Sequence, residues 1–137
     1  ATTIRQGRTP FDQVLAESDV ISLHLPLTPE TRHLIGAPEL ARMKPGAILI
    51  NTARGALVDA VALVESLQRS HLGGAGIDVL DVEPPPPDHP LLRANLPNLI
   101  VTPHVAWASF EAQQRLADEV MANITAFVRG ESRNRVV

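Results

Sequence analysis

The 137-residue chain has no cysteine, which excludes disulfides, thiolate nucleophiles and cysteine-zinc sites. Aromatic residues make up only 3% of it and do not interleave with basic residues, so base stacking is not expected. The net charge is −3, and the basic residues are scattered, which argues against nucleic acid or membrane partners. No apolar run reaches the length of a transmembrane helix. These absences favour a globular protein, which we expect in the reducing cytoplasm.

What is present is an alternation of short apolar runs and helical patterns. Residues 20–25, 47–51, 75–79 and 99–102 have the composition of strands. Helices are expected to begin near Thr9, Thr28, Pro38, Asp59 and Ser109, with Thr9, Asp59 and Ser109 placed as N-caps. The proline run from residue 84, up to Pro90, is expected to be a loop. Continuously apolar strands that alternate with helices predict a parallel α/β sheet covered on both faces.

The residues that follow each expected strand are the informative ones. They are Pro26, then Thr52, Ala53 and Arg54, then the segment from Asp78 to Glu83, and finally His104. Ligands of open α/β sheets bind outside the carboxyl ends of the strands. If the strands are parallel, these loops converge on one rim and bring an arginine, carboxylates and a histidine into a single site.

Each of these residues also has an ordinary explanation. An arginine on a loop is usually solvated, a histidine can be a hydrogen-bonded core residue, and Glu83 can face solvent. Asp78 is more suggestive, because a carboxylate inside a strand must find partners. Their occurrence together at the same end of successive strands favours a functional site over coincidence.

The chemistry of the group is coherent. An arginine matches a carboxylate with its planar fork, and a histidine exchanges a proton near neutral pH. A glutamate beside the histidine favours the imidazolium form and orients the ring. Together they suit a 2-oxo acid whose carbonyl carbon receives a hydride while His104 protonates the oxygen. No amino-acid side chain supplies hydride, so a cofactor is required.

Four segments resemble the D-isomer-specific 2-hydroxyacid dehydrogenases: "LAESDVISLHLPLTPETRHLI", "MKPGAILINTARGALVD", "GGAGIDVLDVEPP" and "NLIVTPHVAWAS". They occur in the order and spacing of that family. The resemblance implies the second half of a Rossmann-type doubly wound parallel sheet. Residues 1–137 would then be a partial dinucleotide-binding domain without its GxGxxG turn and without the substrate domain, with residues 1–7 as the tail of the missing half. The chain is therefore expected to be a fragment.

The same resemblance implies roles for individual residues. Arg54 would bind the substrate carboxylate, Glu83 would be the partner glutamate and His104 the acid-base histidine. The cofactor would be NAD or NADP, and no metal is implied. Asp78 would face the nicotinamide carboxamide, and the remaining cofactor contacts would come from Pro26, Thr31, Thr52 and Ala53, together with Arg54 and His104.

The predicted function is hydride transfer between NAD(P)H and a small 2-oxo or D-2-hydroxy acid. The "PHVAWAS" and "GESRNRVV" segments resemble glycerate dehydrogenases and hydroxypyruvate reductases, whereas formate dehydrogenases carry glutamine where Glu83 stands. Two alternatives stay open: a corepressor-like module regulated by nucleotide, and an inactive remnant. Without a first half, the strand at residues 20–25 would be a bare edge. We expect a homodimer formed through this edge, or a second chain that supplies the missing half.

Overall fold

The computed structural model describes residues 8–136, so that the expected tail at residues 1–7 lies outside the described residues. The chain divides into two compact units, Ala1–His104 and Val105–Val137. The first contains the sheet and every residue predicted for the site. The second is built on one long helix, and each unit is described by itself.

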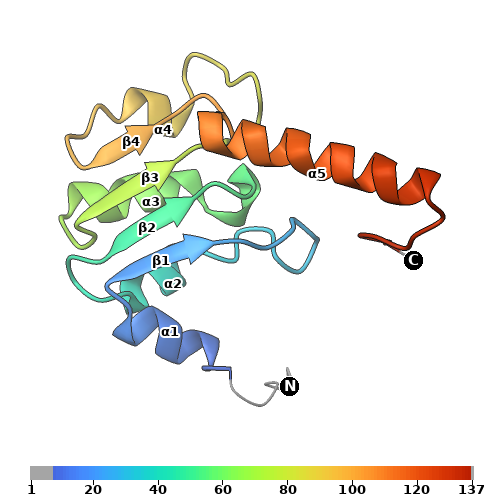
Figure 1. The fold of residues 1–137 in the computed structure, drawn as a ribbon. Coiled ribbons are helices and arrows are strands. Elements are labelled where there is room, and N and C mark those ends of the chain that lie inside the picture. The colour runs from blue at the N-terminus through green and yellow to red at the C-terminus, as the bar shows by residue number, and fades with distance from the viewer. Residues whose placement is uncertain (1–7, 137) are drawn as a thin grey trace. The chain divides into compact units, whose positions relative to one another are not determined.

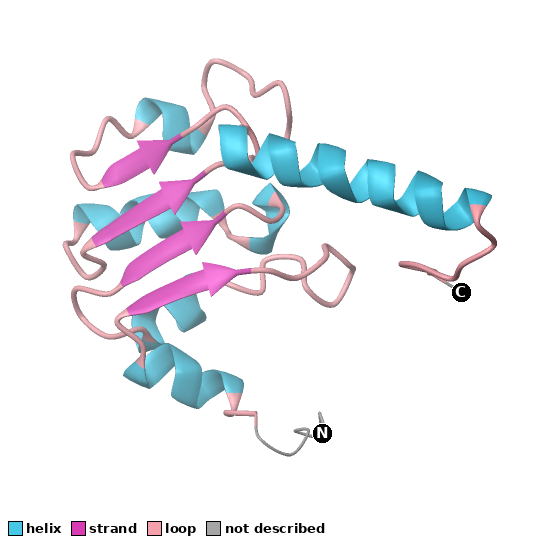
Figure 2. Ribbon diagram, viewed as in Figure 1, coloured by secondary structure: helices cyan, strands magenta, loops and turns pink. Residues whose placement is uncertain are grey.

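The first unit contains one four-stranded sheet in the order β1-β2-β3-β4. The strands are β1 (Val20–Leu23), β2 (Ile48–Asn51), β3 (Gly74–Ile77) and β4 (Leu99–Val101). All three pairings are parallel, so the arrowheads in Figure 1 and Figure 2 point the same way. The predicted parallel sheet is confirmed. β1, β2 and β4 are shorter than the apolar runs that predicted them, and β3 begins one residue earlier and ends two residues earlier than expected.

The two faces of the sheet differ in burial. The register aligns Ile21, Leu49 and Ala75 in one row, and all three are buried in the hydrophobic core. The neighbouring row begins with Val20 and Ile48, which are exposed. Because successive side chains of a strand point to opposite faces, only one face of the sheet packs against the described core of this unit.

Four helices cover that buried face: α1 (Phe11–Glu17), α2 (Ala37–Arg42), α3 (Ala60–Gln68) and α4 (Pro90–Arg93). Each contributes a leucine to the same core, namely Leu15, Leu40, Leu63 and Leu91. Figure 1 shows α2 and α3 behind the strands and α1 below β1 in this view. The sequence pattern predicts helices on both faces; in the described part of the first unit, the opposite face presents Val20, Ile48 and Ile100 at the surface.

The helix caps test the local predictions. The Asp59 carboxylate accepts hydrogen bonds from the Val61 and Ala62 N–H groups at 3.0 Å, which confirms it as the N-cap of α3. The prediction for Thr9 is wrong, because Pro10 occupies the cap position of α1. The helix expected after Thr28 is also wrong: this segment forms turns.

A helix that the pattern did not predict follows the proline run. α4 begins after His89, whose Nδ1 accepts the Leu91 N–H at 3.3 Å, and Pro90 occupies the first helical position. Proline suits that position because it has no N–H to leave unpaired. The expected loop therefore ends one residue earlier than predicted.

The second unit contains α5 (Phe110–Val128), which is capped by Ser109 as predicted. Gly130 has a φ of +70°, the left-handed conformation typical of the residue after a helix. Four apolar side chains spaced four residues apart form a stripe along α5 and are exposed: Leu116, Val120, Ile124 and Val128. Among the residues that the structure describes, α5 and the shorter helices lack the combination of length and apolar character that a membrane span needs.

Candidate active site

The carboxyl ends of the four strands meet at one edge of the sheet, as predicted. The register places Leu23 beside Asn51, Asn51 beside Ile77, and Ile77 beside Val101. The segments that follow these positions therefore begin side by side. This geometry brings residues that are far apart in the sequence to a common rim.

The segment after β1 forms a turn that contains two of the predicted cofactor residues. The Thr31 hydroxyl donates to the Pro26 carbonyl at 2.9 Å and accepts the Thr28 N–H at 2.7 Å. The same segment lowers the pKa of the exposed Glu30 carboxyl, chiefly through the Thr28 side chain. Pro26 and Thr31 thus belong to one hydrogen-bonded turn.

The turn after β2 is organised by Asn51, a residue that the sequence interpretation did not single out. This side chain is fully buried; its Oδ1 accepts the Ala53 N–H at 3.1 Å, and its Nδ2 donates to the Arg54 carbonyl at 2.9 Å. Thr52 lies between these contacts. The Arg54 side chain is exposed, and its guanidinium donates to the Ala53 carbonyl at 2.6 Å. A polar residue that closes an otherwise apolar strand was the available signal for Asn51.

Asp78 is a buried carboxylate directly after β3, with 4% of its surface exposed. The Thr102 hydroxyl, after β4, donates to its Oδ1 at 2.5 Å. The backbone is held as well, because the Asp78 N–H donates to the Asn51 carbonyl and the His104 N–H donates to the Asp78 carbonyl, each at 2.9 Å. Thr102 is a second polar residue that sequence reasoning missed, and it shows how the burial of Asp78 is compensated.

Glu83 and His104 are in contact at the same rim. His104 Nδ1 lies 2.7 Å from Glu83 Oε2, and since an ionised carboxylate only accepts, Nδ1 carries the proton. The Leu80 N–H donates to the other oxygen, Oε1, at 2.8 Å. These two interactions, the backbone one first, lower the pKa of Glu83 below its ordinary value of 4.5. Glu83 is therefore an anion that accepts the hydrogen bond from Nδ1 and orients the imidazole.

The backbone of His104 is itself unusual. Its φ of +55° lies in the left-handed region, which few residues other than glycine adopt. Besides its bond to Asp78, the His104 N–H donates to the Thr102 carbonyl at 3.0 Å. Such conformations persist where the surrounding structure holds them, and they are enriched at functional sites.

A hollow of about 370 Å³ opens beside these residues. Its polar lining comes from Asp78, Glu83, Thr102 and His104, and its apolar walls are built by Leu80, Pro84, Pro85, Leu92, Val101 and Pro103. Three of the residues predicted for the site thus surround one cavity. Arg54, Pro26, Thr31, Thr52 and Ala53 belong to the neighbouring turns of the rim and do not line it.

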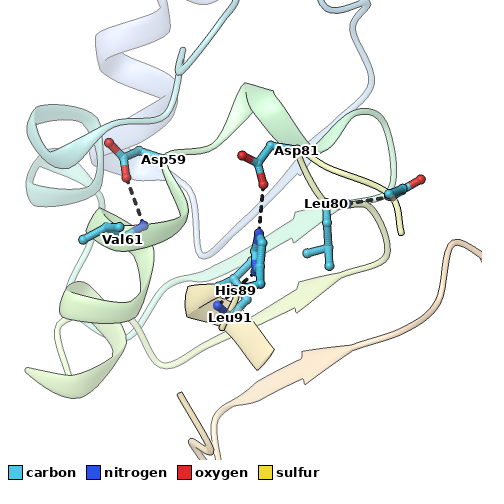
Figure 3. Close-up of polar contacts among 7 residues, drawn as sticks. Asp59, Val61, Leu80, Asp81, His89 and Leu91 are labelled. Carbon is cyan, nitrogen blue, oxygen red and sulfur yellow. Dashed lines mark hydrogen bonds and ion pairs between the residues drawn. The ribbon is translucent and has the colours of Figure 1, made fainter. Parts of the chain in front are cut away.

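One more polar pair lies next to this site, and sequence reasoning missed both members. His89 Nε2 is 2.8 Å from Asp81 Oδ1 (Figure 3), and the His89 side chain is 5% exposed. The hydrogen bond from His89 is the main cause that lowers the pKa of Asp81, against a smaller effect of burial in the opposite direction. The only sequence signal was a histidine directly before a proline, in a segment that the sequence predicts to be a loop.

Comparison with known proteins identifies the family. Residues 2–106 match the model of the D-isomer specific 2-hydroxyacid dehydrogenase NAD binding domain. The chain belongs to this family, and the resemblance deduced from its motifs is confirmed.

Two relatives illustrate the similarity. The chain is 54% identical over 132 residues to the glycerate dehydrogenase of Methylorubrum extorquens, a match that covers 96% of this chain and 42% of that protein. It is 51% identical over 122 residues to the glyoxylate reductase of Korarchaeum cryptofilum, covering 89% of this chain and 36% of the relative. The chain thus spans less than half the length of the relatives that it matches.

A solved structure supports the fold. The NAD-complexed D-isomer specific 2-hydroxyacid dehydrogenase of Lactobacillus delbrueckii ssp. bulgaricus superposes with a TM-score of 0.77 at 34% identity. The match covers 94% of this chain and 43% of that one. The parallel sheet described above is therefore of the Rossmann type found in these dehydrogenases.

Proposed function

We propose that this chain forms part of an NAD(P)-dependent enzyme that interconverts a small 2-oxo acid and its D-2-hydroxy acid, with glyoxylate or hydroxypyruvate as the substrate class. The observation that carries the proposal is the 2.7 Å contact between Glu83 and His104 beside the buried Asp78. An oriented imidazole next to an anion is suited to give a proton to a carbonyl oxygen and to take it back. The names of the relatives support the same substrate class.

The residues at the hollow fit a nicotinamide. Its walls are mostly apolar, as a planar ring requires, and Asp78 offers a carboxylate at the rim that suits the amide hydrogens of a carboxamide. When bound, the reduced cofactor supplies the hydride that goes to the carbonyl carbon of the substrate. Thr52, Ala53, Pro26 and Thr31 are assigned to the remaining length of the dinucleotide, since their turns follow the neighbouring strands on the same rim.

His104 and Arg54 act on different parts of the substrate, the carbonyl oxygen and the carboxylate. His104 donates the proton on Nε2 to the oxygen as the carbon accepts hydride, so that the 2-oxo acid becomes a 2-hydroxy acid and the imidazole becomes neutral. The Glu83 carboxylate accepts the hydrogen bond from Nδ1 and keeps the ring oriented during the step. Arg54 is assigned to the substrate carboxylate, which its exposed guanidinium matches in geometry and charge.

A steady-state assay tests the proposal. The protein that carries this chain is mixed with glyoxylate or hydroxypyruvate and with NADH or NADPH in turn, and the loss of reduced nicotinamide is followed. Turnover with at least one acid is expected, and the preferred cofactor is the one with the higher kcat/KM. Nucleotide binding without turnover of either acid would contradict the proposal and favour a regulatory nucleotide-binding module.

We also propose that the protein is a cytoplasmic homodimer. Within residues 8–136, β1 is an outer strand of the sheet and pairs with β2 alone, and outer strands are prone to pair with a second chain. The absence of cysteine is compatible with a reducing compartment. Light scattering tests the dimer, which a monodisperse monomer would contradict, and cell fractionation tests the location.

A further inference from the structure

His89 is the most completely buried histidine among the described residues, and both of its ring nitrogens are engaged. Nδ1 accepts the Leu91 N–H, so this nitrogen carries no proton. The proton of the neutral ring is then on Nε2, which donates to the Asp81 carboxylate at 2.8 Å. A hydrogen bond to an ionised acceptor is stronger than one between neutral groups.

The pair connects a buried anchor to an exposed loop. His89 lies in the protein interior, whereas residues 81–84 and 86–88 are exposed. Asp81 is two residues from Glu83, and the Leu80 N–H on its other side donates to Glu83 Oε1. Figure 3 shows the imidazole and the Asp81 carboxylate pointing toward each other across the start of this loop. The position of Asp81 therefore limits where Glu83 can lie.

A second contact holds the same segment from the opposite direction. A Cβ built on Gly55 would lie 1.9 Å from the Leu80 carbonyl carbon and 2.3 Å from the Asp81 nitrogen. The turn that carries Arg54 thus packs directly on the backbone that precedes Glu83. The cavity between Gly55, Asp81 and His89 measures about 10 Å³, which leaves no room for a ligand.

We propose that His89 is a positioning residue: through its hydrogen bond to Asp81 it holds the loop in which Glu83 contacts His104. This inference rests on the proposed roles of Glu83 and His104. The Asp81–His89 pair would thus act on the site without lining the hollow beside Glu83 and His104. Loss of the pair releases the loop, so that Glu83 no longer holds the proton of His104 on Nδ1.

Two substitutions separate the two hydrogen bonds of His89. In His89→Asn, the amide oxygen takes the place of Nδ1 and still accepts the Leu91 N–H, but the donor to Asp81 is lost. In His89→Gln, the amide nitrogen takes the place of Nε2 and still donates to Asp81. Asp81→Ala removes the same bond from the other partner at an exposed site. His71→Asn is the matched control, because His71 Nε2 contacts the Leu40 carbonyl at 3.0 Å in a different part of the fold.

The tautomer of His104 is measured by the ¹⁵N shifts of its imidazole in alkaline buffer, and kcat is measured with the acid that the wild type reduces. His89→Asn and Asp81→Ala are expected to move the proton of His104 from Nδ1 toward Nε2 and to lower kcat about tenfold. The variant that combines His89→Asn and Asp81→Ala is expected to have the same kcat as either single variant, since both substitutions remove the same hydrogen bond. His89→Gln and His71→Asn are expected to keep the wild-type tautomer.

An unchanged His104 tautomer in both His89→Asn and Asp81→Ala would overturn the positioning role, whatever the activity of the wild type. The wild type could reduce no 2-oxo acid while His89→Asn and Asp81→Ala still show the expected change of the His104 tautomer. That result would overturn the proposed function and leave the positioning role supported. The two ideas therefore fail by different measurements. A shift of the His104 proton away from Nδ1 in His71→Asn would also contradict the proposal, because the change would then follow from a general loss of stability and not from the Asp81–His89 bond.

Discussion

The two ends of the sheet contain a similar steric device with different consequences. At the carboxyl end, Gly55 lies so close to Leu80 that a side chain would overlap the backbone; at the amino end, a Cβ on Gly73 would lie 2.4 Å from the Gly46 carbonyl oxygen. The carboxyl-end contact joins two segments that carry Arg54 and Glu83. The amino-end contact joins two connections between helices and strands.

The polar residues differ in the same way. At the amino end, Lys44 pairs with Asp19 on the surface, where ion pairs contribute little. At the carboxyl end, Asp78 and His89 are buried and hydrogen-bonded, and Asn51 is fully enclosed. Buried polar groups are costly unless each is satisfied, so their concentration at one edge is a sign of selection for chemistry and not only for folding. The following predictions test this contrast.

The largest effect is expected for His104→Ala in the protein that carries this chain. Removal of the proton donor is expected to lower kcat by about 10²- to about 10⁴-fold. Because the His104 side chain is 47% exposed, the melting temperature should change little. Steady-state kinetics and thermal unfolding check both parts, and a variant with wild-type kcat would remove His104 from the mechanism.

The two glycines provide the next test. Gly55→Ala and Gly73→Ala are both expected to lower the free energy of unfolding by about 2 kcal/mol or more, because neither backbone contact has room for a methyl group. Gly55→Ala should also lower kcat/KM of the folded fraction by about tenfold to about hundredfold, through displacement of Arg54 and Glu83. Denaturant titration and kinetics are compared for the pair. If Gly55→Ala and Gly73→Ala lowered kcat/KM equally, the carboxyl end of the sheet would be no more important for activity than the amino end.

A smaller and more selective effect is expected for Arg54→Ala. Loss of the charged contact to the substrate carboxylate should raise KM about tenfold while kcat falls less, since the contact is made in both the ground state and the transition state. Arg69→Ala is the control, because Arg69 forms a surface ion pair with Glu65 on α3. An Arg54 variant that behaves like the Arg69 variant would exclude a role in substrate binding.

The smallest effect concerns pH. The pKa of Glu83 is lowered in the folded state, so its ionised form stabilises the fold above the ordinary value of 4.5, and this contribution disappears as the pH falls through the lowered value. The stability difference between wild type and Glu83→Gln should therefore shrink as the pH falls below about 4.5, as urea titrations at several pH values would reveal.

The same substitution should lower kcat about tenfold, because the Glu83 carboxylate no longer accepts from Nδ1 and no longer orients the imidazole of His104. Steady-state kinetics check the loss. A kcat equal to that of the wild type would show that the carboxylate does not act on His104.

Much of the fold was readable from local patterns. The parallel sheet followed from short apolar runs between helical patterns, and the caps Asp59 and Ser109 followed from side-chain chemistry that operates within three residues. The failures are also local in origin. Thr28 begins a set of turns because the Thr31 hydroxyl bonds to the Pro26 carbonyl, an interaction that competes with helix formation.

The sequence predicted the site residues that directly follow the strands. It did not predict the residues whose role depends on packing between distant segments. The rim residues Asp78, Glu83 and His104 were found because parallel strands end at one edge. Thr102 and the Asp81–His89 pair were missed, since nothing in the order of residues indicates which partners they meet in space. Asn51 was missed although its side chain bonds to residues 53 and 54 and its place at the end of an apolar strand was a local signal. His89 in particular is held as the N-cap of α4, a helix that the sequence pattern did not predict.

The sequence by itself determined the alternation of strands and helices, the family motifs and the identity of the groups able to bind a carboxylate and exchange a proton. Those properties depend on residue type and short-range spacing. Only the tertiary structure decided that Glu83 contacts His104, that Thr102 compensates the buried Asp78 and that the Asp81–His89 pair flanks the Glu83 loop. Hydrogen bonds require a separation of about 3 Å, and for residues 8 to 24 positions apart this is set by the path of the chain.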